Sequence, residues 1–258
     1  MASLRVGVLL EPQYTTYASY ARAMRQVESL GVDTIWNWDH FIPPYGNHKG
    51  NHLEAWTLLT AMATLTSRAE IGCMVTCNSY RNPNLLATMA KTVDHISGGR
   101  LILGIGAGWF ELEYREYGYT FGTARERLMA LADALPRIKH RWQAELPKPV
   151  RNPIPILIGG EGEQVTLKLV AQHADIWNGF GPPRQYRHKC EVLDQWCAKV
   201  GRNPKKIERS VLVPSYTART LDEYVEAGAS HIIMNLRDPW KFAGVEKLVQ
   251  WRDSRQKA

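Results

Sequence analysis

The feature that most constrains the fold of this chain is an eightfold alternation of short apolar runs with amphipathic segments. The apolar runs are rich in Val, Ile and Leu and have the length of β-strands. The expected strands are residues 4–10, 34–38, 70–76, 100–105, 154–158, 175–178, 207–213 and 231–235. Eight strand–helix units in 258 residues favour a (β/α)8 TIM barrel, a fold that typically takes about 250 residues. A doubly wound open sheet is the alternative.

The segments between the strands carry apolar residues three or four positions apart, which is typical of surface helices. The expected helices are residues 17–30, 55–66, 84–96, 124–142, 164–173, 185–200, 221–227 and 240–252. Gly31, Gly201 and Gly228 each follow such a segment, where a left-handed residue commonly ends a helix. The Pro-rich stretch 146–155 leads directly into the fifth strand and marks no linker. We therefore expect one α/β barrel domain over residues 1–258.

Charge, cysteines and hydropathy exclude several classes of protein. The net charge of +7 is dispersed along the chain, which argues against nucleic-acid binding and favours a small acidic ligand. No apolar run approaches the roughly 20 residues of a membrane-spanning helix, and the first residues lack the pattern of a signal peptide. The four cysteines lack the spacing of a metal site, and His48 and His52 could share a metal only on a helix, which Gly50 between them disfavours. We expect a cytoplasmic protein with buried cysteines and without a metal or a membrane partner.

Polar residues and glycines gather at the carboxyl ends of the expected strands, where the active site of a barrel lies. They are Glu11, Gln13, Asp39, His40, Thr76, Asn78, Gly108, Trp109, Glu111, the run 159–162, Asn178, Ser215 and Asn235. The loops 39–53 and 108–122 at this end are long, and long loops on one face commonly carry function. The pattern predicts a site at this face.

Two glycine-rich segments follow expected strands. Residues 159–162, Gly-Gly-Glu-Gly, precede a helical segment, where free N–H groups and the helix dipole favour an anion such as phosphate. A tight turn that needs glycine for its own geometry is the alternative, and no P-loop Lys follows. Gly104, Gly106 and Gly108 lack the spacing of a dinucleotide fingerprint. We interpret these three as a close backbone approach to a flat ligand.

His40 follows Asp39 at the end of the second expected strand. An imidazole at the mouth of a barrel is suited to exchange a proton near neutral pH, although a structural histidine is the alternative. Trp36 and Trp38 precede it and either form a flat wall for an aromatic ligand or belong to the core.

Taken in order, these motifs resemble those of the bacterial luciferase-like flavin and deazaflavin oxidoreductases. The matching segments are residues 39–41 (Asp-His-Phe), 75–83, 97–111, 155–162 and 174–178. They are most similar to the branch that depends on coenzyme F420. The resemblance implies a compact luciferase-like TIM barrel that holds F420, or alternatively FMN, with its ring over the third strand.

The resemblance also implies roles for individual residues. It implies that His40 is catalytic and that the third strand contains a non-prolyl cis peptide bond, matched here by Met74–Val75. The implied cofactor contacts are Asp39, Met74, Val75, Thr76, Asn78, Ala107, Gly108, Gly159, Gly160, Glu161 and Gly162. Ala107 and Gly108 match backbone contacts, whereas Gly159, Gly160 and Gly162 match the phosphate cradle, in agreement with the anion site inferred from the residues alone.

The implied activity is hydride transfer between F420 and a small organic substrate, with His40 assisting proton transfer. The alternatives are an FMN-dependent monooxygenase and a barrel that binds the cofactor without turnover. Relatives that oxidise sugar phosphates place a glutamate where this chain has Trp109, with Glu111 and Glu113 further on, so sugar-phosphate oxidation is not expected. The connection 213–220 is also short, so the pocket is expected to be either more open or closed by the loops after the second and fourth strands. A homodimer is compatible with the outer helices.

Overall fold

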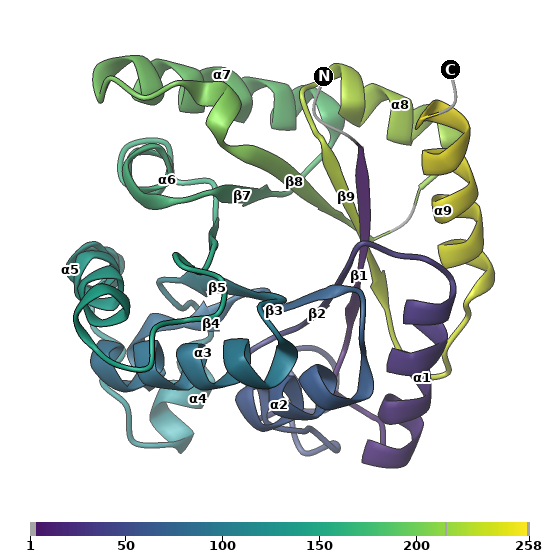
Figure 1. The fold of residues 1–258 in the computed structure, drawn as a ribbon, viewed down its shortest axis with the longest axis horizontal. Helices are drawn as coiled ribbons and strands as arrows, with labels where there is room; N and C mark the ends of the chain where they lie inside the picture. Colours follow the sequence, from purple (N-terminus) through teal and green to yellow (C-terminus); the bar gives the residue numbers. More distant parts are fainter. Residues whose placement is uncertain (1–3, 215, 257–258) are drawn as a thin grey trace.

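The structure, a computed structural model, describes residues 4–214 and 216–256, and its strands form one closed parallel barrel (Figure 1). The strands are β1 (Arg5–Leu10), β2 (Thr34–Asn37), β3 (Glu70–Cys73), β4 (Thr76–Cys77), β5 (Leu101–Gly106), β6 (Ile156–Gly159), β7 (Ile176–Gly179), β8 (Glu208–Val213) and β9 (His231–Leu236). Because β3 and β4 both pair with β5 and follow each other along the third barrel strand, the nine segments make eight barrel strands. The predicted (β/α)8 barrel is confirmed, and the open sheet is wrong.

Helices surround the barrel and cover the outer face of its sheet (Figure 1). They are α1 (Tyr17–Ser29), α2 (Ala55–Leu65), α3 (Pro83–Ser97), α4 (Glu111–Glu116), α5 (Ala124–Ala144), α6 (Thr166–His173), α7 (Pro183–Lys199), α8 (Ala218–Glu226) and α9 (Ala243–Gln256), with 3-10 turns η1 (Asn78–Tyr80) and η2 (Pro204–Lys206). Gly31, Gly201 and Gly228 have φ angles of 92°, 69° and 106°, so the predicted left-handed helix ends are confirmed.

The structure differs from the prediction at one strand and has one additional short helix. The third strand, predicted as one run over 70–76, is interrupted by a cis peptide bond at Met74–Val75, as the family resemblance implied. Helix α4 was not predicted, because its six residues are too short to show a helical period. Both differences lie at the carboxyl end of the barrel, where the site was expected.

The core has two layers, as the alternation of side chains along the strands requires. In β1, Val6, Val8 and Leu10 pack against the helices, whereas Leu9 belongs to the cluster inside the barrel. Trp36 is fully buried in that inner cluster, so it is a core residue and not a wall of the site. All four cysteines are buried and free, as expected.

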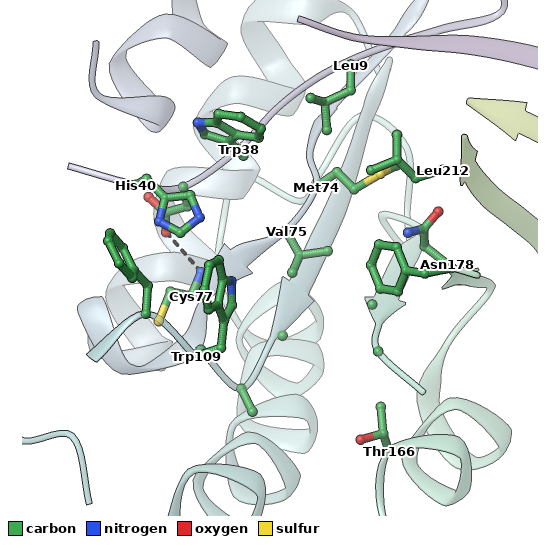
Figure 2. Close-up of a pocket in the computed structure, with 18 of the residues that line it drawn as sticks. Leu9, Trp38, His40, Met74, Val75, Cys77, Trp109, Thr166, Asn178 and Leu212 are labelled. Carbon is green, nitrogen blue, oxygen red and sulfur yellow. Dashed lines mark hydrogen bonds between the residues drawn. The ribbon is translucent and has the colours of Figure 1, made fainter. Parts of the chain in front are cut away.

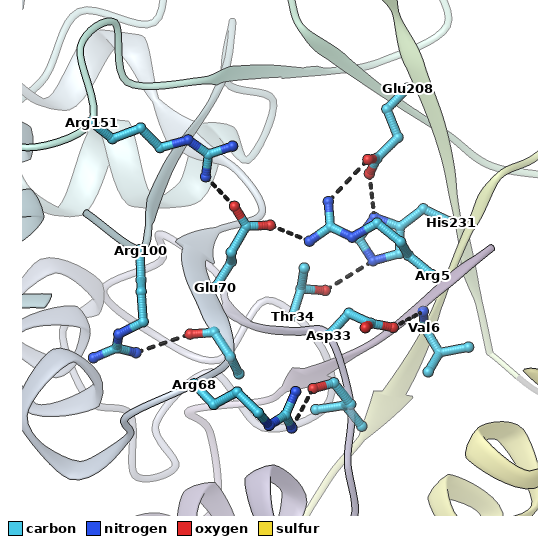
Figure 3. Close-up of polar contacts among 12 residues, drawn as sticks. Arg5, Val6, Asp33, Thr34, Arg68, Glu70, Arg100, Arg151, Glu208 and His231 are labelled. Carbon is cyan, nitrogen blue, oxygen red and sulfur yellow. Dashed lines mark hydrogen bonds and ion pairs between the residues drawn. The ribbon is translucent and has the colours of Figure 1, made fainter. Parts of the chain in front are cut away.

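The amino ends of the strands are tied together by a network of charged side chains (Figure 3). Arg5 donates to Glu208 over 2.9 Å and also pairs with Glu70, which in turn pairs with Arg151. The fully buried His231 contacts Glu208 through Nδ1 at 2.7 Å. Burial raises the pKa of Glu208, but His231 and Arg5 outweigh it and lower that pKa to about 2. This end of the barrel is closed by ion pairs, and the opposite end carries the candidate site.

Across 4–214 and 216–256, no helix has the length and apolarity to cross a membrane.

Candidate active site

A cavity of about 380 Å³ opens at the carboxyl ends of the barrel strands. Eight of the twelve residues assigned to catalysis or cofactor contact line it: Asp39, His40, Met74, Val75, Ala107, Gly108, Gly159 and Gly160. Figure 2 shows Trp38, His40 and Trp109 on one side of the cavity, Met74 and Val75 in its middle, and Asn178 and Thr166 on the other side. The cavity therefore brings together residues from five separate sequence motifs.

Four other predicted residues do not line the cavity. Thr76 is fully buried and Asn78 nearly so, and within the described residues Oγ1 of Thr76 and Oδ1 of Asn78 have no hydrogen-bond partner. Glu161 accepts a hydrogen bond of 2.7 Å from the backbone N–H of Phe180 and so holds the loop after β7. The carbonyl of Gly162 accepts from Leu167 N at 2.9 Å. Ser215, which was expected at this face, lies outside the described residues.

Glycines on neighbouring strands make room for the break in the third strand. A Cβ on Gly104 would lie 1.9 Å from the carbonyl oxygen of Cys73. A Cβ on Gly106 or Gly159 would lie 2.7 Å or 2.9 Å from methyl groups of Val75. The lack of a side chain at Gly104 and Gly106 accommodates the chain at 73–75, which projects Met74 and Val75 into the cavity. Gly106 and Gly108 also line the cavity, and the predicted approach of this backbone to a flat ligand stays a prediction.

His40 is held at the edge of the cavity by a buried glutamate that the sequence analysis did not assign. Its Nδ1 lies 2.7 Å from Oε2 of Glu113, whose side chain is 0% exposed. The same carboxylate accepts hydrogen bonds from the hydroxyl of Tyr80 at 2.7 Å and from the backbone N–H groups of Phe41 and Ile42. Glu113 comes from α4 and Tyr80 from η1, so two short elements fix the imidazole that follows β2.

The charge of Glu113 sets the orientation of the proton on His40. Burial raises the pKa of Glu113, but the hydrogen bonds from His40, Tyr80 and Phe41 N outweigh burial and keep that pKa below its ordinary value. An ionised carboxylate only accepts hydrogen bonds, so Nδ1 of His40 carries the hydrogen that it donates. In the neutral imidazole, Nε2 is then an unprotonated acceptor on the cavity side. This is the form that can take a proton from a ligand.

Asp39 is buried and forms an ion pair with Arg81. Both of its carboxylate oxygens accept from Arg81, at 2.6 and 3.0 Å, and Oδ2 also accepts from Cys77 N at 3.0 Å. Arg81 also donates to Glu54 over 2.7 Å, and Glu54 caps the first turn of α2. Asp39 thus joins the second and third barrel strands beside the cavity, and its predicted contact with a cofactor stays a prediction.

Aromatic rings surround His40. Trp38, Trp109 and Phe110 approach it edge to face, with ring centroids 5.9, 5.7 and 5.7 Å away. Nε1 of Trp38 donates to Nε2 of His52 over 3.1 Å. Burial, together with the nearby His40, lowers the pKa of His52 to about 4, so His52 is the neutral acceptor that this hydrogen bond requires. The predicted aromatic wall is therefore formed by Trp38 and not by Trp36.

The opposite end of the cavity suits an anionic or polar group. Gly159, Gly160 and Thr166 line it where the chain turns from β6 into α6. Gly160 has a φ of 124°, and no side chain caps the amino end of α6. Nδ2 of Asn178, also in the lining, has no hydrogen-bond partner in the described part of the chain. A glycine turn before an uncapped helix can bind a phosphate group through backbone N–H groups.

Glu113 and Arg81 are the residues that sequence reasoning missed. Glu113 stands four residues after Trp109, and no pattern in the sequence indicates that it contacts His40. Arg81 lies inside a matched motif, but neither pattern nor spacing shows that it faces Asp39. Glu111, the other glutamate noted there, is exposed.

Searches of known proteins return many relatives. One is an uncharacterised protein of Mycobacterium tuberculosis, 27% identical over 202 residues, which cover 72% of this chain and 70% of that protein. Another is the F420-dependent glucose-6-phosphate dehydrogenase of Amycolatopsis mediterranei, 32% identical over 46% of this chain and 36% of that enzyme. A third is the F420-dependent hydroxymycolic acid dehydrogenase of Mycobacterium tuberculosis, 29% identical over 68% of this chain and 52% of that enzyme.

Solved structures share the fold. An F420-dependent secondary alcohol dehydrogenase in complex with an F420–acetone adduct superposes with a TM-score of 0.86 at 16% identity, over 96% of this chain and 98% of that one. The coenzyme F420-dependent tetrahydromethanopterin reductase of Methanopyrus kandleri gives a TM-score of 0.78 at 15% identity, with 97% of each chain covered. The sequence model of the luciferase-like monooxygenase family matches residues 2–258. This chain therefore belongs to the luciferase-like monooxygenase family.

Proposed function

We propose that this protein is an F420-dependent oxidoreductase in which His40 exchanges a proton with a small organic substrate. The observation that carries the proposal is the pair of His40 and Glu113 at the cavity, which turns Nε2 of the imidazole toward a ligand. Relatives of named function support the cofactor, because several are described as F420-dependent dehydrogenases. The type of reaction, oxidation of an alcohol or reduction of a carbonyl, is taken from relatives and a solved structure described as dehydrogenases, and none of their particular substrates is carried over to this chain.

The residues of the cavity fit F420. Met74 and Val75 form an apolar surface in the middle of the cavity, against which a flat ring system can pack (Figure 2). Gly159 and Gly160 leave space that a Cβ would fill, since a Cβ at Gly160 would lie 3.2 Å from the methyl of Thr166. The unpartnered Nδ2 of Asn178 offers a donor to a polar edge of the ligand. These residues would hold the ring and the phosphate of the cofactor, as the family resemblance implies.

The chain itself supplies proton transfer and orientation. When bound, F420 supplies a two-electron hydride acceptor or, in its reduced form, a hydride donor. His40 takes the hydroxyl proton at Nε2 when the substrate is oxidised and returns it when a carbonyl is reduced. Glu113 stabilises the imidazolium that forms, because its carboxylate accepts the hydrogen of Nδ1 in both states. The rings of Trp38, Trp109 and Phe110 limit the access of water to this exchange.

Titration of the purified protein with F420 and, separately, with FMN tests the cofactor. We expect F420 to bind more tightly, measured through the quenching of protein and cofactor fluorescence. A His40→Ala variant should bind F420 within about threefold of the wild type. Its turnover should fall by about 10²–10⁴, the usual contribution of a general acid–base group.

The same measurements can reject the proposal. Tight binding of FMN together with absent binding of F420 would favour the monooxygenase alternative. Tight binding of F420 without hydride transfer to any of a broad panel of alcohols and ketones would indicate a binding protein. Turnover by His40→Ala at the wild-type rate would remove His40 from the mechanism.

A further inference from the structure

The part of the cavity next to His40 is enclosed by four aromatic side chains, Trp38, Tyr45, Trp109 and Phe110, which we call the aromatic box. Neighbouring rings of the box contact one another: the centroids of Trp38 and Tyr45 are 6.0 Å apart, those of Tyr45 and Trp109 6.4 Å, and those of Trp109 and Phe110 5.3 Å. Three different segments contribute them, namely the end of β2, the loop 39–53 and the loop that precedes α4.

The loop that carries Tyr45 is fastened to the barrel. Tyr14, just after β1, donates its hydroxyl to the carbonyls of Tyr45 and Asn47 at 2.7 and 3.0 Å. His52, at the other end of the loop, pairs with Gln13 in a β-bridge and accepts from Trp38. The box is therefore preorganised by contacts on both ends of the loop, and binding does not have to order it.

The charges around the box select against an anionic substrate. Among the described residues that line the cavity there is no Lys and no Arg. The carboxylate of Asp39 is paired with Arg81, and Glu113 is buried behind His40. A phosphate or carboxylate on the substrate would lose its hydration here without gaining a cation, which is costly. His40 is the group in the box that can exchange a proton with the substrate.

The exposure of the box indicates what should cover it. Trp109 and Tyr45 are 56% and 59% exposed, although they face one another across the cavity mouth. Large aromatic side chains that remain in water beside a preformed cavity commonly mark a binding surface. A flat apolar ligand that packs against these rings from the cavity would remove part of their surface from water.

We propose that the substrate is an uncharged molecule with an aromatic body and a hydroxyl or carbonyl group at the reacting carbon, and that Trp109 is the residue that selects it. This inference rests on the proposed function for the reaction at His40. The box receives the aromatic body, and Nε2 of His40 receives the oxygen. The absence of a cation excludes phosphorylated and carboxylated analogues of the same body.

Equilibrium binding tests the substrate class without turnover. Calorimetric titrations with 1-phenylethanol, 4-(1-hydroxyethyl)benzoate and 2-butanol compare a neutral aryl alcohol with its carboxylate and with an alkyl alcohol. They are run with the protein saturated in reduced F420, which cannot accept a hydride from an alcohol, and again without F420. We expect 1-phenylethanol to bind at least about tenfold more tightly than either of the others, as stacking in a desolvated site predicts. Equal or tighter binding of the carboxylate would overturn the inference.

Variants of Trp109 test its selecting role. Trp109→Ala should weaken 1-phenylethanol about tenfold and leave 2-butanol within about twofold. Trp109→Arg should shift the preference toward the carboxylate, because it adds the cation that the cavity lacks. Tyr17→Ala removes an aromatic side chain that is 50% exposed outside the cavity, and it should change neither affinity. Unchanged preference in both Trp109 variants would contradict its assigned role.

The two proposals fail in different ways. If F420 does not bind, the proposed function is wrong, and the titrations without F420 still decide whether the box prefers a neutral aryl ligand. If F420 binds and hydride transfer occurs while the carboxylate binds as well as the alcohol, only the inference about the substrate fails.

Discussion

Replacement of Glu113 by Gln changes the charge next to His40 while keeping the shape of the side chain. The amide oxygen can still accept from the N–H groups of Phe41 and Ile42, which contact Oε1 in the native chain. The amide nitrogen, however, faces His40 and Tyr80 as a donor, where the carboxylate was an acceptor. We therefore expect the neutral imidazole to move its hydrogen from Nδ1 to Nε2, so that the cavity meets an N–H group instead of a lone pair.

The size of the effect follows from four hydrogen bonds that Glu113 accepts. In Glu113→Gln, each of these hydrogen bonds loses its charged partner and contributes about 1 kcal/mol less to stability. Part of this loss is offset because burying an amide costs less than burying a carboxylate. The free energy of unfolding should fall by about 1–3 kcal/mol, which leaves the protein folded. Turnover should fall by about 10²–10⁴, because the wrong nitrogen of His40 carries the hydrogen.

Nitrogen NMR of the imidazole rings measures the tautomer directly and needs no substrate. Spectra recorded at about pH 9, where an ordinary imidazole is neutral, should show His40 protonated at Nδ1 in the wild type and at Nε2 in Glu113→Gln. A His40→Asn variant assigns the signal. The matched control is Glu111→Gln, a change at an exposed glutamate of the same helix, which should alter neither tautomer nor turnover. An unchanged tautomer with unchanged turnover in Glu113→Gln would refute this reasoning.

Three further predictions concern stability and are measured by urea unfolding. Gly104→Ala places a Cβ 1.9 Å from a backbone carbonyl oxygen of the neighbouring strand, and we expect it to lower the free energy of unfolding by about 3 kcal/mol or more. Gly98→Ala, whose Cβ would meet no described atom within 4 Å, should lower it by about 1 kcal/mol. Arg81→Met leaves a fully buried carboxylate unpaired and should cost about 3–5 kcal/mol, whereas Arg219→Met, whose side chain is 89% exposed, should cost less than about 0.5 kcal/mol. His52 has a pKa of about 4 in the folded state against 6.5 ordinarily, so the unfolded chain binds more protons between these values. Stability should fall by about 2 kcal/mol from pH 7 to pH 5 relative to His52→Gln.

Each of these predictions has an outcome that contradicts it. Equal costs for the two glycine variants would mean that the neighbouring strand yields easily to the added methyl group. A small loss in Arg81→Met would mean that water or another cation reaches the carboxylate. If the free energy of unfolding of the wild type and of His52→Gln changed equally with pH, His52 would take up a proton as readily in the folded as in the unfolded protein.

Much of the fold is predictable from the sequence because its signals are local and repeated. The eight apolar runs and the glycines at helix ends, such as Gly201, depend on burial and backbone geometry that neighbouring residues already define. The local pattern does not predict the interruption of the third strand at Met74–Val75, because Val and Thr favour a continuous strand. It depends on space that Gly104 and Gly106 provide from another strand.

The candidate site was predictable only in part. His40 and the glycines at 159–160 stand at strand ends, a position that by itself predicts proximity to the cavity in a barrel. Glu113 stands on a six-residue helix inside a loop, and its contact spans 73 positions of the chain. No periodic pattern indicates such a contact. The same holds for Arg81 and Asp39, whose pairing is decided by how two loops fold over the barrel.

The proposed function requires that the cavity binds F420 and that His40 exchanges the proton of the reaction. The absorbance of the cofactor in a single turnover measures both. F420-loaded protein is mixed with a panel of aryl and alkyl alcohols, and protein loaded with reduced F420 is mixed with the matching ketones. We expect the wild type to interconvert at least one such pair, Glu111→Gln to match it, and His40→Ala to be slower by about 10² or more. A wild type that turns over no pair, or a His40→Ala variant that reacts as fast as the wild type, would show that the proposed function is wrong.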